Sequence, residues 1–142
     1  MSNATHNAAL VAALAVARVR AWRTGLLALH KTLIDAERAR YERIYGPISS
    51  AHEALRLVLH DPWFAWLRPM ADRIVQIDER LASPEPISPA EVATIRGHIT
   101  ALLHVDRAPE SFRVEYRRAL QDWPEVVVTH GQLMALLADD RS

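Results

Sequence analysis

The chain of 142 residues contains no cysteine and four glycines. The absence of cysteine excludes disulfides, thiol nucleophiles, iron–sulfur clusters and zinc sites built on thiolates. No glycine-rich phosphate loop is present, and the serines lie at helix caps and near the termini, without the nucleophile elbow of a hydrolase. The sequence therefore indicates no catalytic residue and favours a protein that is not an enzyme.

An excess of charge is also missing, because 17 Lys and Arg balance 17 Asp and Glu. A nucleic-acid binder needs a basic surplus to neutralise phosphates, so we expect no nucleic-acid partner. The hydrophobic fraction of 50% and the charged fraction of 24% are typical of a globular domain. We expect one domain over residues 1–142, with a core that needs neither a disulfide nor a metal to fold.

No hydrophobic run is long enough to cross a membrane. The longest, Ala8 to Ala17, has ten residues, whereas a spanning helix needs about 20. No Lys or Arg precedes this run, while Arg18, Arg20 and Arg23 follow it, which is the reverse of a secretory signal peptide. We therefore expect a cytoplasmic protein with no membrane partner.

Helix-start signals recur along the chain, whereas the alternation typical of strands is absent. Ser50 and Ser88 each begin a capping box, and Pro62 and Pro124 occupy first helical positions. These signals predict helices at residues 7–44, 51–60, 62–82, 89–105, 110–122 and 124–139. The expected fold class is all-α, an up-and-down bundle of four main helices plus one short helix, with the second main helix kinked at Pro62 and Pro69.

Four ionisable residues fall where helical periodicity predicts apolar ones. His30 and Glu37 lie within the apolar stripe of the first helix, Asp78 lies on the apolar side of the helix after Pro62, and His130 lies near the centre of the last stripe. An unpaired buried carboxylate costs several kcal/mol, so these residues must be paired, ligated or protonated.

Two explanations fit these four residues. In the first, His30 or His130 donates to Glu37 or Asp78 in a core network, and Arg40 helps to neutralise the carboxylates. In the second, the four side chains bind iron, manganese, zinc or a small ligand, since bundle-core sites use imidazole and carboxylate groups from facing helices. The Glu-x-x-His spacing of di-iron bundles is absent, so we expect no cofactor and keep the metal site as the alternative.

The most distinctive segment is residues 59–69, which holds two of the four Trp and one of the two Phe. In a helix, Phe64 and Trp66 point away from Trp63, which leaves one large ring on the surface. The segment therefore predicts an interaction surface of Trp63, Phe64, Trp66 and Arg68. The alternative is that the rings wedge a kinked helix into the core.

Toward Ala8, the apolar stripe of the first helix becomes narrower and its side chains become smaller. Residues 1–21 are therefore expected to be a helical extension that packs closely against another helix, such as one from a second subunit. The leading functional hypothesis is a non-enzymatic helical bundle that acts through a protein partner or a second copy of itself. It uses either this extension or the Trp-rich kink.

Several segments together resemble a family of small bacterial proteins. The match is most specific in His60-Asp-Pro-Trp-Phe-Ala-Trp-Leu-Arg-Pro69, and it extends to residues 29–31, 35–38, 41–42 and 74–79, to Phe112, and to Tyr116 through His130. The resemblance covers most of the chain after about residue 22. It implies a helical bundle without an assigned activity, so it transfers no catalytic residue, and residues 1–21 lie outside its pattern.

Overall fold

The computed structural model describes residues 3–104 and 108–139. Within these residues the chain is all-α, as predicted, and no strand is present. The elements are α1 (Asn3–Tyr45), α2 (Ala51–His60), the 3-10 helix η1 (Pro62–Leu67), α3 (Arg68–Ala82), α4 (Pro89–Leu103), α5 (Glu110–Asp122) and α6 (Pro124–Ala138). Among the described helices, none combines the length and the apolar character that a membrane span requires.

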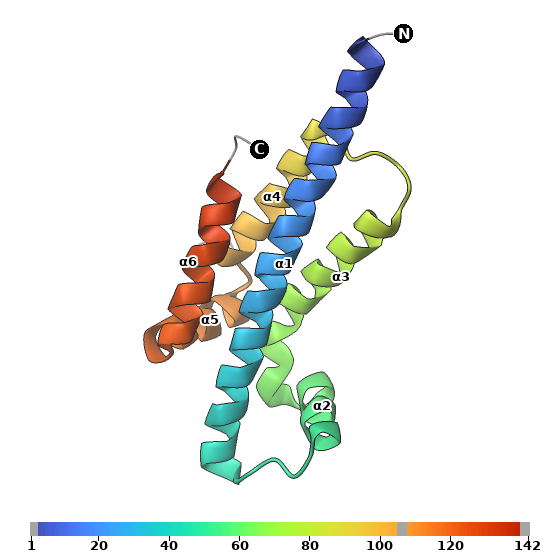
Figure 1. Ribbon diagram of the computed structural model, residues 1–142. Helices are drawn as coiled ribbons and strands as arrows, with labels where there is room; N and C mark the ends of the chain where they lie inside the picture. The colour runs from blue at the N-terminus through green and yellow to red at the C-terminus, as the bar shows by residue number, and fades with distance from the viewer. Residues whose placement is uncertain (1–2, 105–107, 140–142) are drawn as a thin grey trace.

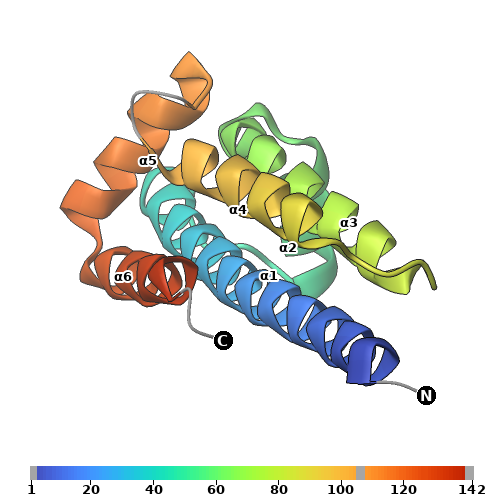
Figure 2. The same ribbon diagram turned by 90° about the horizontal axis from the view of Figure 1, so that it is seen from above.

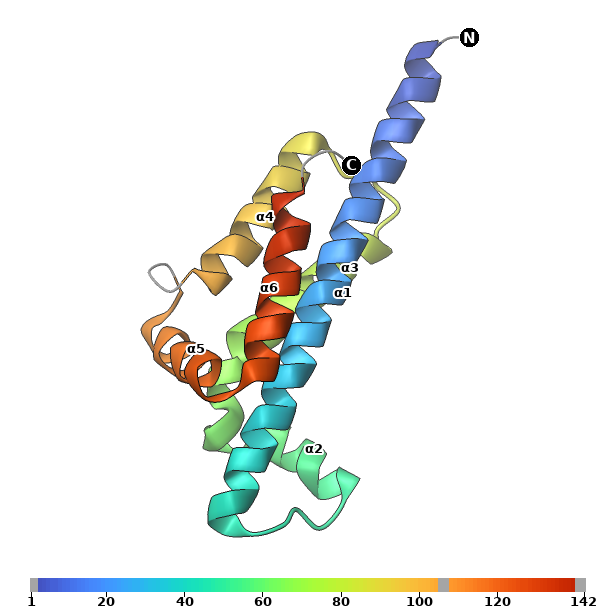
Figure 3. The ribbon, with the colours of Figure 1, turned by 60° about the vertical axis from the view of Figure 1, so that its left-hand side comes forward.

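The long helix α1 is the axis of the molecule. It has 43 residues, and α6 packs on one side of it while α3 and α4 pack on the other (Figure 2). The N-terminal end of α1 projects past all the other helices (Figures 1 and 3). Residues 3–11 are accordingly exposed on every face, so this end of the helix contributes no side chain to the core.

The core lies along the face of α1 that the sequence pattern predicts. Val19, Trp22, Leu26, Leu29 and Leu33 are spaced three or four residues apart, and all are buried. They pack against a cluster drawn from every other helical element. The continuity of this cluster explains why the helices of the described residues form one packed body.

Local signals fix the helix ends. Gly46 has a φ of +91° just after α1, and only glycine adopts that conformation without strain, so it ends the helix. The Ser50 hydroxyl accepts a hydrogen bond from the Glu53 backbone N–H at 3.1 Å, and the Ser88 hydroxyl accepts one from the Glu91 N–H, also at 3.1 Å. Both predicted serine caps are therefore confirmed.

The segment after Asp61 differs from the kinked helix that the prolines predict. Residues 62–67 form the 3-10 helix η1, and α3 begins only at Arg68 with Pro69 in its first turn. A 3-10 helix has about three residues per turn, so Trp63 and Trp66 share a face, and so do Phe64 and Leu67. The α-helical phase used for the prediction was wrong here.

Candidate functional site

Glu37 is buried with none of its surface exposed. Its Oε1 accepts from Arg118 Nη2 at 2.6 Å and from Arg40 Nε at 3.3 Å. Its Oε2 accepts from Arg40 Nη2 at 3.1 Å and from Trp66 Nε1 at 3.2 Å. The prediction that Arg40 neutralises Glu37 is confirmed. Each carboxylate oxygen already has two donors, so Glu37 has no free lone pair to offer a metal ion.

Arg118 and Trp66 are the partners that sequence reasoning missed. They lie 81 and 29 residues after Glu37, so only the fold brings them to it. Burial alone would lower the pKa of Arg118, but its hydrogen bonds to Glu37 and Glu115 raise the pKa above its ordinary value. Trp63 adds a bond from Nε1 to the Glu37 backbone carbonyl at 3.3 Å, and these contacts tie η1 and α5 to α1.

The other three predicted residues have separate surroundings. Asp78 accepts from Arg23 Nε at 2.7 Å, and its side chain is 44% exposed. The prediction that Asp78 lies in the core was therefore wrong. His130 Nδ1 lies 2.6 Å from the Tyr116 hydroxyl. Burial lowers the pKa of His130 and raises that of Tyr116, which keeps both groups neutral and lets the phenol donate to the imidazole.

His30 lines a cavity of about 250 Å³ between α1, α2, η1 and α3. Burial lowers its pKa too. It forms no hydrogen bond to Glu37 or Asp78 among the interactions of the described chain, and neither does His130. The predicted bonds from histidine to these carboxylates are therefore absent.

The structure thus does not gather His30, Glu37, Asp78 and His130 into one site. Within residues 3–104 and 108–139, no group of three or more His, Asp and Glu side chains is placed to hold a metal ion. The bundle-core iron, manganese or zinc hypothesis gains no support from this geometry. For Glu37, the ion-pair network with Arg40 and Arg118 accounts for the buried charge.

The aromatic segment is mostly part of the core. Phe64 is 2% exposed and Trp66 is 7% exposed, so neither can serve as the exposed ring of the predicted interaction surface. Trp63 is half-buried, with the Arg40 guanidinium 4.0 Å from the centre of its ring, and Arg68 is exposed. The alternative reading, in which the rings wedge η1 into the core, fits the burial.

The N-terminal half of α1 carries a row of apolar side chains that the described chain covers only in part. Leu10 is 52% exposed and Leu14 is 42% exposed; Ala17 is exposed and Ala21 is half-buried. These four residues, here called the α1 stripe, are spaced by four, three and four positions. That is the spacing of a coiled-coil seam, which a second helix covers.

Charge is excluded from the α1 stripe. No Asp, Glu, Lys or Arg occurs between Asn3 and Ala17. At about 100° per residue, Arg18 and Arg20 fall on either side of the stripe and not on it. Leu136 of α6 adds apolar surface one turn beyond Ala21. It is 40% exposed, and its Cδ1 lies 3.1 Å from where a Cβ on Gly25 would be. The stripe therefore offers packing contacts without charge recognition.

No protein-family model, curated protein or solved structure matches the chain.

Proposed function

We propose that this protein acts by self-association, with the α1 stripes of two copies packed as an antiparallel helix pair. The observation that carries the proposal is the order of side chains in the stripe. Two leucines stand at its N-terminal end and two alanines at its C-terminal end, all at seam spacing. A stripe of this composition is complementary to its own reverse.

In an antiparallel pair related by a twofold axis, Leu14 of one copy faces Ala17 of the other, and Leu10 faces Ala21. Each contact then places a large side chain against a small one, which lets the two helices approach closely and fill the seam. The same patch serves both copies, as a twofold interface requires. The antiparallel direction also sets the two helix dipoles in opposite directions.

A parallel pair fits the stripe less well. It would set leucine against leucine at one end and alanine against alanine at the other. The first end would then be crowded and the second would contain gaps, so the seam would pack poorly.

Self-association also accounts for the projection of α1. Isolated helices shorter than about 12–15 residues are marginal in water, and residues 3–11 receive no packing from their own chain. In the proposed dimer they lie against the middle of the partner's α1. Contact with the partner's α1 then both removes the apolar surface from water and stabilises residues 3–11 as a helix.

The experiment is the molecular mass of the full chain in solution over a range of protein concentrations. We expect twice the chain mass of 16.0 kDa at high concentration, and a monomer for Leu14→Glu. The matched control is Val114→Glu on α5, where the residue is 59% exposed; this variant should dimerise like the parent chain. A monomeric parent chain, or equal masses for the two variants, would contradict the proposal.

A compensating exchange tests the register. Ala17→Leu places leucine against Leu14 of the partner and should weaken the dimer. Adding Leu14→Ala to the same chain restores one large and one small residue at each contact, so the double variant should dimerise more tightly than Ala17→Leu alone. If the second change weakens the dimer further, the antiparallel register is wrong.

A further inference from the structure

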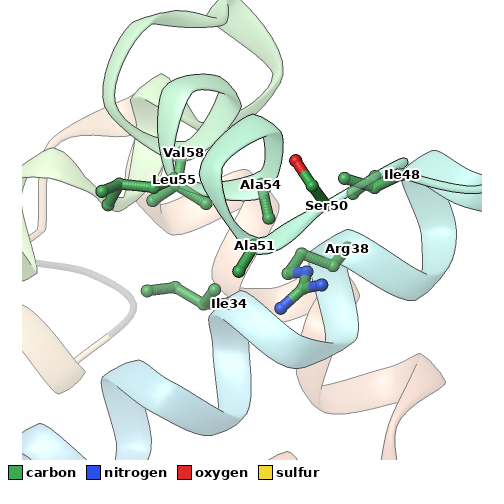
Figure 4. Close-up of a pocket in the computed structure, with 8 residues that line it drawn as sticks. All are labelled: Ile34, Arg38, Ile48, Ser50, Ala51, Ala54, Leu55 and Val58. Carbon is green, nitrogen blue, oxygen red and sulfur yellow. The ribbon is translucent and has the colours of Figure 1, made fainter.

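A second surface, away from the α1 stripe, has the chemistry of a small-molecule site. It is a cavity of about 530 Å³ between α1, the loop after α1 and α2 (Figure 4). Ligand pockets in proteins usually range from about 300 to 1,000 Å³, so the volume suits a small organic molecule. Its lining consists of Ile34, Arg38, Ile48, Ser50, Ala51, Ala54, Leu55 and Val58.

The walls of the cavity are apolar over most of their surface. Figure 4 shows Leu55 and Val58 of α2 on one side and Ile34 of α1 opposite them, at the end of the cavity away from Ser50. Arg38 and Ser50 stand together toward the other end. An aliphatic group would be covered at the first end and an acidic group held at the second.

Arg38 is a cation that lacks a counter-ion in the described chain. Its Nε is buried and has no hydrogen-bond partner. The acids near it along α1 are engaged elsewhere. Glu37 pairs with Arg40 and Arg118, Asp35 pairs with Lys31 at 3.1 Å, and Glu42 accepts from the Ile48 backbone N–H at 3.3 Å. A buried donor without a partner costs free energy that an incoming acceptor would recover.

The start of α2 supports the same ligand charge. Ser50 is the N-cap, and its hydroxyl oxygen accepts from the Glu53 N–H at 3.1 Å, which leaves the N–H groups of Ala51 and His52 as the free donors of the first turn. These donors and the helix dipole favour an anion. The guanidinium of Arg38 matches the two oxygens of a carboxylate, which it can bind with two parallel hydrogen bonds.

We propose that this cavity binds a monocarboxylate with an aliphatic chain, the carboxylate at Arg38 and the chain between Ile34, Leu55 and Val58. The site is independent of the proposed dimer, because none of the α1 stripe residues lines it. Failure of one proposal therefore leaves the other standing.

The test is calorimetric titration of the full-length protein with octanoate, and with octanol as the uncharged probe of the same chain length. We expect octanoate to bind and octanol to bind at least about tenfold more weakly, since a charge-assisted hydrogen bond to arginine is lost. Arg38→Gln should weaken octanoate binding by a similar factor. Arg117→Gln, which removes an exposed arginine from α5, should leave it unchanged.

A second variant guards against a folding defect in Arg38→Gln. Ala51→Leu keeps the arginine and places a larger side chain in the cavity, so it should weaken octanoate and octanol together. Helical circular dichroism of each variant checks that it has folded. The proposal is overturned if octanoate does not bind, if octanol binds equally well, or if folded Arg38→Gln or Ala51→Leu binds octanoate like the parent chain.

Discussion

Replacing Glu37 by glutamine tests how much the buried ion pairs with Arg40 and Arg118 stabilise the fold. The substitution keeps the shape of the side chain, so it opens no cavity, but it removes the negative charge between Arg40 and Arg118. One amide oxygen remains as an acceptor where two carboxylate oxygens took four hydrogen bonds. The amide nitrogen is itself a donor and faces other donors.

The size of the effect follows from burial. Removing one partner of a buried ion pair costs about 3–5 kcal/mol. The arginine side chains are 27% and 23% exposed, and Arg118 keeps Glu115 at 3.1 Å, so the lower end of that range applies. We expect Glu37→Gln to lose about 3 kcal/mol of unfolding free energy, or roughly 6–12 °C in Tm for a chain of this size.

The assay is thermal unfolding followed by circular dichroism, at one fixed protein concentration because association raises apparent stability. Asp78→Asn is the matched control. It breaks the ion pair with Arg23, whose two side chains are 36% and 44% exposed, and exposed pairs contribute about 1 kcal/mol or less. Equal small losses for the two variants would refute the claim that burial makes the Glu37 network important.

Three further outcomes are expected. Gly25→Val should destabilise the fold by about 1–3 kcal/mol through overpacking, because a Cβ at Gly25 would meet Leu133 Cδ1 at 3.0 Å; Gly97→Ala, with nothing within 4 Å, should gain up to about 1 kcal/mol from helix propensity. Denaturant titration of both variants checks this pair, and a loss in Gly97→Ala would count against it. Trp66→Phe should cost about 1–3 kcal/mol, because it removes the Nε1 donor to Glu37 at 3.2 Å; an unchanged Tm would show that this bond is not needed. Burial lowers the pKa of His30 and His130 below 6.5 in the folded chain, so the unfolded chain binds more protons below that pH and stability should fall as the pH drops from about 7 to 5. His130→Gln should make that fall shallower in urea titrations at each pH, and an unchanged slope would contradict the assignment.

The helices could be predicted closely because their signals are local. Ser50 and Ser88 mark starts through side-chain caps, and Gly46 marks an end through its backbone freedom. The alternation of buried positions from Val19 to Leu33 follows from the helical period alone. Such features need no knowledge of what lies across the molecule.

The site could be predicted only in part. Glu37 falls on the apolar stripe of α1, and Arg40 follows it by one turn of the same helix. Its burial and its bond to Arg40 could therefore be predicted from helical spacing. The donor groups of Arg118 and Trp66 depend on how α5 and η1 pack against α1, which no local pattern encodes. The prediction for the aromatic rings failed because other helices cover η1 on both of the faces that carry these rings. Phe64 packs beside Tyr41 of α1 and Trp66 beside Phe112 of α5, and no local pattern encodes those contacts.

The α1 stripe could be predicted in part from the sequence, whereas the cavity at Arg38 could not. The uncharged run from Ala8 to Ala17 already favours contact with another helix, but its exposure is known only because α1 projects past the other helices. The cavity at Arg38 has no sequence signal, since its lining comes from two helices and the loop between them.

Cysteine cross-linking can locate the contacts of the antiparallel α1 dimer residue by residue, because the chain has no cysteine of its own. Leu14→Cys and Ala17→Cys chains are prepared separately, mixed and mildly oxidised. A disulfide needs Cα atoms about 4.4–6.8 Å apart, so we expect the mixture to form a cross-linked dimer that contains one chain of each kind, and either variant alone to form little. Efficient cross-linking of each variant to itself, or none in the mixture, would show that the antiparallel register is wrong.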